Sequence, residues 1–143
     1  NDAEPSLFQV FPEGNWVDAT PDSPYFIIGR TSYGKPILDR LLRYDTPIDK
    51  ALALAYLAFD ATRASVVDVD FPIDVTVMRS GSSVLQRSRF TAADLGPAHD
   101  WWHGRLQAAL DAFPMDWSRR LDEPSSLVGP ALAGSRRLED ATD

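Results

Sequence analysis

Alternating apolar and polar residues near the start of the chain predict a β-hairpin. Leu7 to Phe11 are apolar and β-prone, Pro12 to Asn15 have turn chemistry, and Trp16 to Ala19 predict a returning strand. After a turn-rich stretch, Tyr25 to Ile28 form an apolar run closed by Gly29. A run of this length predicts a short buried strand.

Two helices are predicted next. Pro36 suits the first turn of a helix over Ile37 to Leu42, because its missing amide would be unpaired there anyway. A second helix begins at Thr46, whose hydroxyl can cap it, with Pro47 at its first position and Asp49 favourable to the helix dipole. Apolar residues at spacings of three and four predict one buried face through about Thr62: Ile48, Ala51, Leu52, Ala55 and Phe59.

A second hairpin and a last helix complete the predicted elements. Residues Val66 to Met78 are β-branched and alternating, Arg79 to Ser82 have turn chemistry, and Val84 to Phe90 predict the returning strand. A helix over Pro97 to Phe113 is expected to bury its apolar side chains, Trp102, Leu106, Ala109, Leu110 and Phe113. Proline, glycine, serine and mixed charge beyond Pro114 predict a disordered tail.

Length and charge limit what the protein can be. The 143 residues, of which 44% are hydrophobic and 24% charged, can bury one core and leave no room for a second domain. The formal net charge of -7 gives no positive potential to attract phosphate polymers or anionic lipid head groups. Nucleic acid and membrane partners are therefore not expected, and no apolar run approaches the roughly 20 residues that span a bilayer.

The absence of cysteine excludes disulfides, thiolate zinc sites and a cysteine nucleophile. This composition suits a reducing compartment, so we expect the cytoplasm. The chain starts at Asn1, with neither the basic nor the apolar region of a secretory signal. That start suggests processing, truncation or an incomplete reading frame.

The segment from Gly29 to Pro36 resembles a phosphate-binding loop, because Gly29, Gly34 and Lys35 have the right spacing between a predicted strand and a predicted helix. Pro36, however, stands where such a loop needs a Ser or Thr hydroxyl for magnesium, and it removes a backbone N–H from the phosphate cradle. An ordinary strand-to-helix turn is the favoured interpretation, and no cofactor is expected.

His99 and His103 lie one helical turn apart, as in zinc peptidases of the H-E-x-x-H type. Here Asp100 replaces the glutamate, and the chain has no third histidine, so a third ligand would be a carboxylate that no motif identifies. A metal hydrolase using His99 and His103 stays open as an alternative. An exposed helix face with two histidines is the simpler interpretation, and no metal site is assigned.

Asp68, Asp70 and Asp74 share one face of the predicted strand, because their spacing is even. Mutual repulsion and a cation site are both conceivable there. In an acidic protein, a solvated face is the favoured interpretation.

Seven segments, in this order and spacing, resemble the bacterial ancestral proteasome-like β-subunit family known as Anbu. They cover roughly residues 7 to 114, and the block from Tyr33 to Arg40 is the most specific. The segments are Leu7–Asn15, Ala19–Pro24, Ile28–Gly29, Tyr33–Arg40, Phe59–Thr62, Phe71–Asp74 and Trp102.

The resemblance implies an α+β fold, namely the second half of the αββα sandwich of N-terminal nucleophile hydrolases. Residues 1–115 would form this part of a proteasome-like β-subunit domain, and residues 116–143 the disordered tail. A sandwich divided at mid-chain leaves sheet edges unpaired, so the chain is expected to depend on a partner.

The resemblance also implies the chemistry. In that family an N-terminal threonine supplies the hydroxyl nucleophile and an α-amine base, which a lysine and an aspartate tune. None of these three residues lies in this chain. Asn1 cannot replace the threonine, because it has an amide where the hydroxyl is needed. We expect a fragment of a threonine peptidase that acts on peptides or proteins and assembles with other copies into a ring or spiral.

Two loops align with family segments that approach the nucleophile, Gly29 to Ser32 and Ser65 to Asp70. They make Arg30, Ser65 and Asp68 the candidate supporting residues. The family typically has a serine in the first loop and an aspartate followed by a serine in the second, so this chain departs from the pattern at all three positions. A non-catalytic assembly or interaction module with the same fold stays open beside the peptidase.

Overall fold

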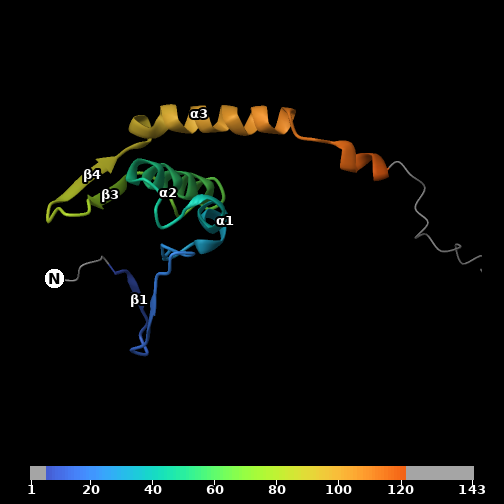
Figure 1. Ribbon diagram of the computed structural model, residues 1–143. Helices are drawn as coiled ribbons and strands as arrows, with labels where there is room; N and C mark the ends of the chain where they lie inside the picture. Colours follow the sequence, from blue (N-terminus) through green and yellow to red (C-terminus); the bar gives the residue numbers. More distant parts are fainter. Residues whose placement is uncertain (1–5, 122–143) are drawn as a thin grey trace, which may run out of the picture. The chain divides into compact units, whose positions relative to one another are not determined.

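The computed structural model describes residues 6–121 (Figure 1). The chain divides into two compact units, residues 1–100 and 101–143. The fold is a mixture of helices and small antiparallel sheets, as the α+β prediction requires. No helix in the described range is long and apolar enough to cross a membrane. The elements in chain order are β1 (Phe8–Val10), β2 (Trp16–Asp18), α1 (Thr31–Leu41), α2 (Ile48–Arg63), β3 (Ile73–Met78), β4 (Leu85–Phe90), α3 (Ala92–Asp111) and the 3-10 helix η1 (Asp116–Leu121).

The first predicted hairpin is confirmed. Strands β1 and β2 pair antiparallel, with Gln9 opposite Val17. Gly14 closes the turn with a φ of 86°, a left-handed conformation that a residue without a Cβ adopts at no steric cost. The backbone N–H of Gly14 donates to the Phe11 carbonyl at 3.0 Å.

The strand predicted over Tyr25 to Ile28 is wrong, because these residues belong to no sheet. A strand needs a neighbour for its backbone hydrogen bonds. The two sheets within residues 6–121 are the hairpins β1-β2 and β3-β4, and this segment pairs with neither of them. Ile28, predicted as buried, is 90% exposed.

Helix α1 begins at Thr31, six residues before the predicted start at Ile37. Pro36 therefore lies inside the helix, where it cannot donate to the carbonyl four residues earlier. The early start lays Gly34 against α2, where both Gly34 and Leu38 are buried. Packing against the second helix outweighs the lost hydrogen bond.

Helix α2 was correctly predicted, but its cap and its buried face differ from the prediction. Thr46 does not cap the helix, since its hydroxyl accepts a hydrogen bond from the Arg43 N–H at 2.8 Å. Asp49 lies in the first turn as expected. The buried apolar residues are Leu54 and Ala58, while Leu52 of the predicted face is 36% exposed.

Strands β3 and β4 form the second predicted hairpin, with Asp74 opposite Arg89. Gly81 has a φ of 75° in the turn, and the Ser82 N–H donates to the Arg79 carbonyl at 3.0 Å. The predicted strand over Val66 to Met78 was too long at its start, since β3 begins only after Pro72. Burial alternates along β3, which confirms a half-buried strand.

Helix α3 starts at Ala92 rather than Pro97, because Thr91 and Asp94 form a capping box. The Thr91 N–H donates to Asp94 Oδ2 at 2.7 Å, and the Asp94 N–H approaches Thr91 Oγ1 at 3.4 Å. The predicted burial of Trp102, Leu106, Ala109, Leu110 and Phe113 is wrong, since none of these residues is buried. Of the predicted tail, residues 116–121 form η1 and the remainder lies outside the described residues.

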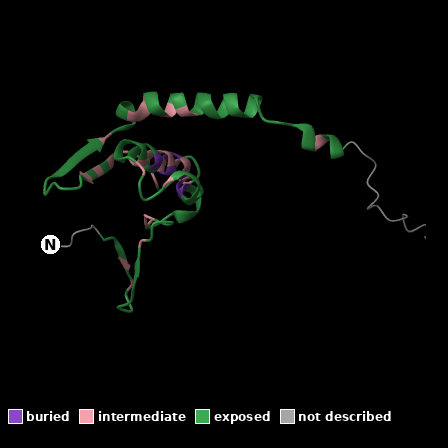
Figure 2. Cartoon of the chain, viewed as in Figure 1, coloured by how far each residue is buried: buried purple, intermediate pink, exposed green. Residues whose placement is uncertain are grey.

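The core of the described residues is small and lies between α1 and α2. Its buried apolar residues are Leu38, Leu54 and Ala58. Figure 2 shows the buried positions confined to these two helices. The half-buried side chains packed against them are Tyr25, Ile27, Ile37 and Leu42.

Candidate functional site

The structure brings together two of the three candidate supporting residues. Arg30 directly precedes α1, and Asp68 lies between α2 and β3. The Arg30 Nη2 and Nε atoms donate to Asp68 Oδ2 at 3.0 and 3.3 Å. These hydrogen bonds hold the pKa of the Asp68 carboxyl below its ordinary value. The two residues are 38 positions apart in the sequence, so the ion pair forms only because the fold brings them together.

The third candidate, Ser65, turns toward its own helix. Its hydroxyl donates to the Ala61 carbonyl at 2.9 Å, just beyond the end of α2. This contact is the ordinary local bond of a serine at a helix terminus. Ser65 therefore lies on the same segment as Asp68, with its hydroxyl engaged by the backbone.

An apolar groove of about 380 Å³ begins beside Arg30. The segment before α1 forms one part of its lining, and the facing residues of α1 and α2 form another. Val69, next to Asp68, also lines it. The main lining side chains are Phe26, Ile27, Ile28, Leu38, Ala55 and Phe59.

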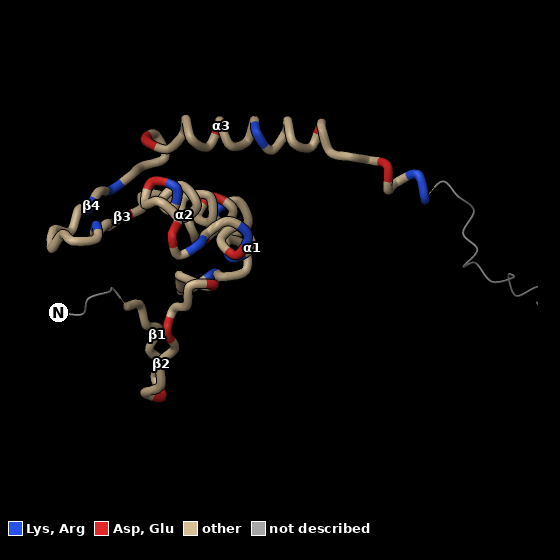
Figure 3. The backbone as a smooth tube through the Cα atoms, in the orientation of Figure 1, with Lys and Arg blue, Asp and Glu red and all other residues tan. Residues whose placement is uncertain are grey.

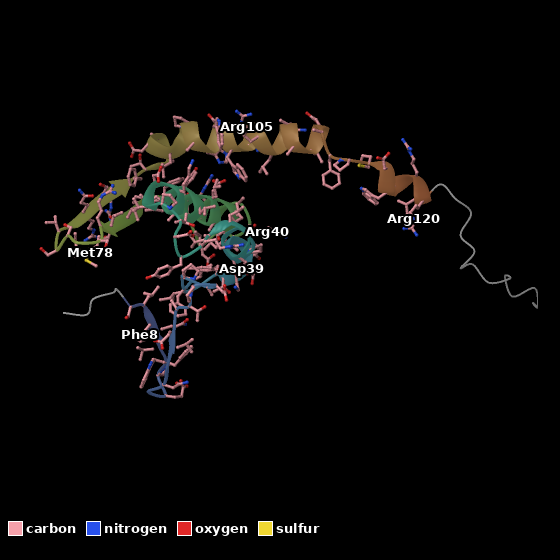
Figure 4. All side chains as sticks on the ribbon, viewed as in Figure 1. Phe8, Asp39, Arg40, Met78, Arg105 and Arg120 are labelled. Carbon is pink, nitrogen blue, oxygen red and sulfur yellow. The ribbon has the colours of Figure 1, made fainter. Side chains whose placement is uncertain are left out.

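A network that the sequence analysis missed lies at the side of α1. Lys35 Nζ donates to Asp39 Oδ1 at 2.7 Å, and the Tyr25 hydroxyl donates to the same oxygen at 2.6 Å. The Lys35 and Tyr25 bonds lower the pKa of Asp39, and the bond to Asp39 raises the pKa of Lys35. Figure 4 labels Asp39 on α1. The i, i+4 spacing of Lys35 and Asp39 was the available signal.

This network also bears on whether the segment from Gly29 to Pro36 is a phosphate-binding loop. Lys35 is in the second turn of α1 and is bound to Asp39, rather than in a loop ahead of the helix. The favoured interpretation as an ordinary turn into a helix agrees with this geometry.

His99 joins α3 to α2 through a buried carboxylate. Its Nδ1 lies 3.0 Å from Oδ1 of Asp60, whose side chain is 9% exposed. Arg63 Nη2 reaches the same oxygen at 3.2 Å, and its guanidinium lies over the Phe71 ring. Among residues 6–121, no group of three or more His, Asp or Glu side chains could hold a metal ion. The arrangement does not support the metal-hydrolase alternative.

The three predicted strand aspartates do not share a strand face. Asp68 pairs with Arg30, and Asp70 accepts a hydrogen bond from the Phe71 N–H at 2.8 Å. Asp74 alone lies in β3, where Arg89 Nη2 donates to it at 2.7 Å. The Arg89 hydrogen bond, aided by Arg87, lowers the pKa of Asp74.

Comparisons with family models and with curated proteins found no match. Solved structures do match. Anbu from Hyphomicrobium sp. strain MC1 is 37% identical with a TM-score of 0.75, over 79% of this chain and 50% of that chain. The helical assembly of the Anbu complex from Pseudomonas aeruginosa is 34% identical with a TM-score of 0.71, over 87% and 50%. Anbu (ancestral beta-subunit) from Yersinia bercovieri is 38% identical with a TM-score of 0.70, over 76% and 47%.

These matches place the chain in the class of proteasome-like β subunits. The chain belongs to the Anbu family, as its sequence segments predicted, and spans about half the length of the Anbu chains it matches. A match to only half of each Anbu chain is consistent with the prediction that this chain is the C-terminal part of such a subunit.

Proposed function

We propose that this chain is the C-terminal part of a threonine-type peptidase subunit and that the nucleophilic threonine belongs to the half it does not contain. The observation that carries the proposal is the match to Anbu proteins at 34% to 38% identity over half of their length. Peptides or proteins are the proposed substrates, and other copies of the subunit are the proposed assembly partners.

The uncovered apolar surface supports an αββα sandwich completed by the other half. Residues Tyr25 to Ile28 have no strand beside them, and the groove that Ile28 helps to line is open. Strands of the other half would pair with this segment and fill the groove, because unpaired backbone and exposed apolar surface are both unfavourable in water. Residues 1–115 are assigned to this part of the domain.

Arg30, Ser65 and Asp68 are the proposed supporting residues. In the proposed reaction the terminal amine accepts the proton of the threonine hydroxyl, which then attacks the peptide carbonyl. Asp68 would stabilise the protonated amine by its negative charge, and Arg30 keeps that carboxylate ionised and oriented. Ser65 would contribute an acceptor oxygen from the same segment, since its hydroxyl proton is donated to the Ala61 carbonyl.

The test is peptide hydrolysis by the natural gene product that contains this chain. Replacing its leading threonine with alanine is expected to abolish turnover. Asp68→Asn is expected to lower kcat by about tenfold or more, as for loss of a group that supports proton transfer. Asp111→Asn, a matched change in α3, is expected to leave kcat unchanged.

Two results would count against the peptidase. Turnover that survives the threonine replacement contradicts the nucleophile. An assembled protein that cleaves no peptide would favour the non-catalytic assembly module. The 143 residues expressed alone are expected to bind apolar dyes and to melt without cooperativity, and a sharp monomeric transition contradicts the half-sandwich.

A further inference from the structure

The α2–β3 loop, residues 64–72, carries Asp68 to Arg30, and the contacts of Asp68 itself are too weak to explain this position. The side chains of Arg30 and Asp68 are 58% and 55% exposed. An ion pair with this much solvent around it contributes little to stability. Val67, next to Asp68, is fully exposed and holds nothing in place. The position of the loop must therefore come from other contacts.

The start of the loop is tied to the last turn of α2 by backbone hydrogen bonds. The N–H groups of Ser65 and Val66 both donate to the Thr62 carbonyl, at 2.9 and 3.0 Å. Thr62 is itself buried, and its hydroxyl donates to the Ala58 carbonyl at 2.8 Å. These bonds fix the first residues of the loop, but they end before Asp68.

The end of the loop is held by the ring of Phe71, which packs on two residues of α2 that are one turn apart. The ring centroids of Phe59 and Phe71 are 5.3 Å apart and the rings are inclined at 70°, a favourable edge-to-face arrangement. The Arg63 guanidinium lies over the Phe71 ring, 5.4 Å from its centroid. Asp68 is only three residues before this anchor.

Arg63 is in turn held by a buried carboxylate. Helix α2 carries both acidic and basic residues (Figure 3), and its last turn contains Asp60 and Arg63. Arg63 Nη2 donates to Asp60 Oδ1 at 3.2 Å, and the two side chains are 29% and 9% exposed. A carboxylate this buried keeps its partner close, because an unpaired buried charge is very unfavourable. The ion pair thus fixes the guanidinium where it meets the Phe71 ring.

We propose that Arg63 and Phe71 are positioning residues, which hold the far end of the α2–β3 loop so that Asp68 stays beside Arg30. The inference rests on the proposed function, in which Asp68 supports the terminal amine. Arg63 and Phe71 act through Asp68 and not on the reacting groups.

The first test measures the position of Asp68 without peptidase activity, by carboxyl NMR titration of the natural gene product. Phe71→Leu keeps an apolar side chain but removes the ring. The pKa of Asp68 is expected to rise toward its ordinary value, because the Arg30 hydrogen bonds that lower it are lost when the loop moves. Phe71→Tyr keeps the ring and is expected to leave this pKa unchanged.

Two arginine variants separate the ring contact from the charge. Arg63→Lys keeps a positive charge for Asp60 but loses the flat guanidinium, so the pKa of Asp68 is again expected to rise. Arg79→Leu, at an exposed arginine before the β3–β4 turn, is the matched control and is expected to change nothing. An unchanged Asp68 pKa in Phe71→Leu or in Arg63→Lys overturns the proposal.

Asp74 in β3 reports whether such an effect is local. Its pKa is lowered by Arg89 and is expected to stay lowered in every variant. A rise at Asp74 together with Asp68 overturns the proposal, because the substitution would then disturb more than the loop.

The second test is peptide hydrolysis. Phe71→Leu is expected to lower kcat roughly three- to tenfold with KM unchanged, because a displaced supporting group affects the reaction and not substrate binding. Its combination with Asp68→Asn is expected to be no slower than Asp68→Asn alone. Beside an active wild type, an unchanged kcat or multiplied losses overturn the proposal. A wild type that cleaves no peptide refutes the proposed function, while the titration still tests the positioning.

Discussion

Gly34 in α1 lies directly against Ala58 in α2. A Cβ added at residue 34 would come 2.9 Å from both the Cβ and the carbonyl oxygen of Ala58. A Cβ atom essentially never lies this close to another non-bonded heavy atom, and neither neighbour is the end of a flexible side chain. The two helices can therefore meet only because residue 34 has no side chain.

We expect Gly34→Ala to destabilise the α1–α2 pair. Overpacking costs about 1 to 3 kcal/mol, which exceeds the roughly 0.5 to 1 kcal/mol that alanine gains over glycine in a helix. The free energy of local opening, measured by hydrogen exchange of α1 and α2 amides in the natural gene product that contains this chain, reports the change. Gly104→Ala is the control, since nothing lies within 4 Å of an added Cβ there, and it is expected to be neutral or stabilising. A neutral Gly34→Ala would contradict the close packing.

Leu54 and Leu52 provide a second matched comparison on α2. Leu54 is 9% exposed in the core, whereas Leu52 is 36% exposed. Leu54→Ala is expected to cost about 2 to 5 kcal/mol, because it leaves a cavity, and Leu52→Ala clearly less. The same hydrogen-exchange measurement tests this order. Equal costs would mean that the helix buries a different face.

The contact between His99 and Asp60 is expected to couple α3 to α2. Asp60→Ala would leave the partly buried Arg63 guanidinium without its carboxylate, at a cost of about 1 to 3 kcal/mol. A double-mutant cycle with His99→Ala is expected to give a coupling of roughly 0.5 kcal/mol or more. Asp60→Asn keeps an acceptor oxygen and should cost less than Asp60→Ala. Strict additivity in the cycle would contradict the contact.

Arg30 should control the ionisation of Asp68. Because the Arg30 hydrogen bonds lower the folded pKa of Asp68, the pair stabilises the fold above the ordinary carboxyl pKa of about 3.9. That stabilisation is lost as the pH falls through the lowered value. Arg30→Gln is expected to return the Asp68 pKa toward its ordinary value in a carboxyl NMR titration. Asp74, which Arg89 holds, serves as the internal reference and should keep its lowered pKa. An unchanged Asp68 titration would exclude the ion pair in solution.

Local signals predicted the elements that neighbouring residues can build alone. The Pro12 to Asn15 turn and the Arg79 to Ser82 turn each join strands that are close in sequence, so both hairpins were predictable. The three- and four-residue spacing of apolar side chains located α2. The ordered segments around Tyr33 to Arg40 identified the family before any geometry was known.

Other features depended on partners that are distant in sequence or absent from the chain. The Arg30–Asp68 pair spans 38 residues, and the start of α1 followed from the packing of Gly34 on Ala58 rather than from Pro36. The apolar spacing over α3 predicted a buried face that the structure does not have, because spacing along a helix does not show whether another element packs against it.

The amino-acid order by itself determined the hairpins, the position of α2, and membership of the Anbu family, because turns and periodicity act between near neighbours. Tertiary structure alone decided that Arg30 meets Asp68, that His99 meets Asp60, and that Tyr25 to Ile28 stay unpaired. Those outcomes depend on which surfaces meet in space, and contacts between distant residues leave no local pattern along the chain.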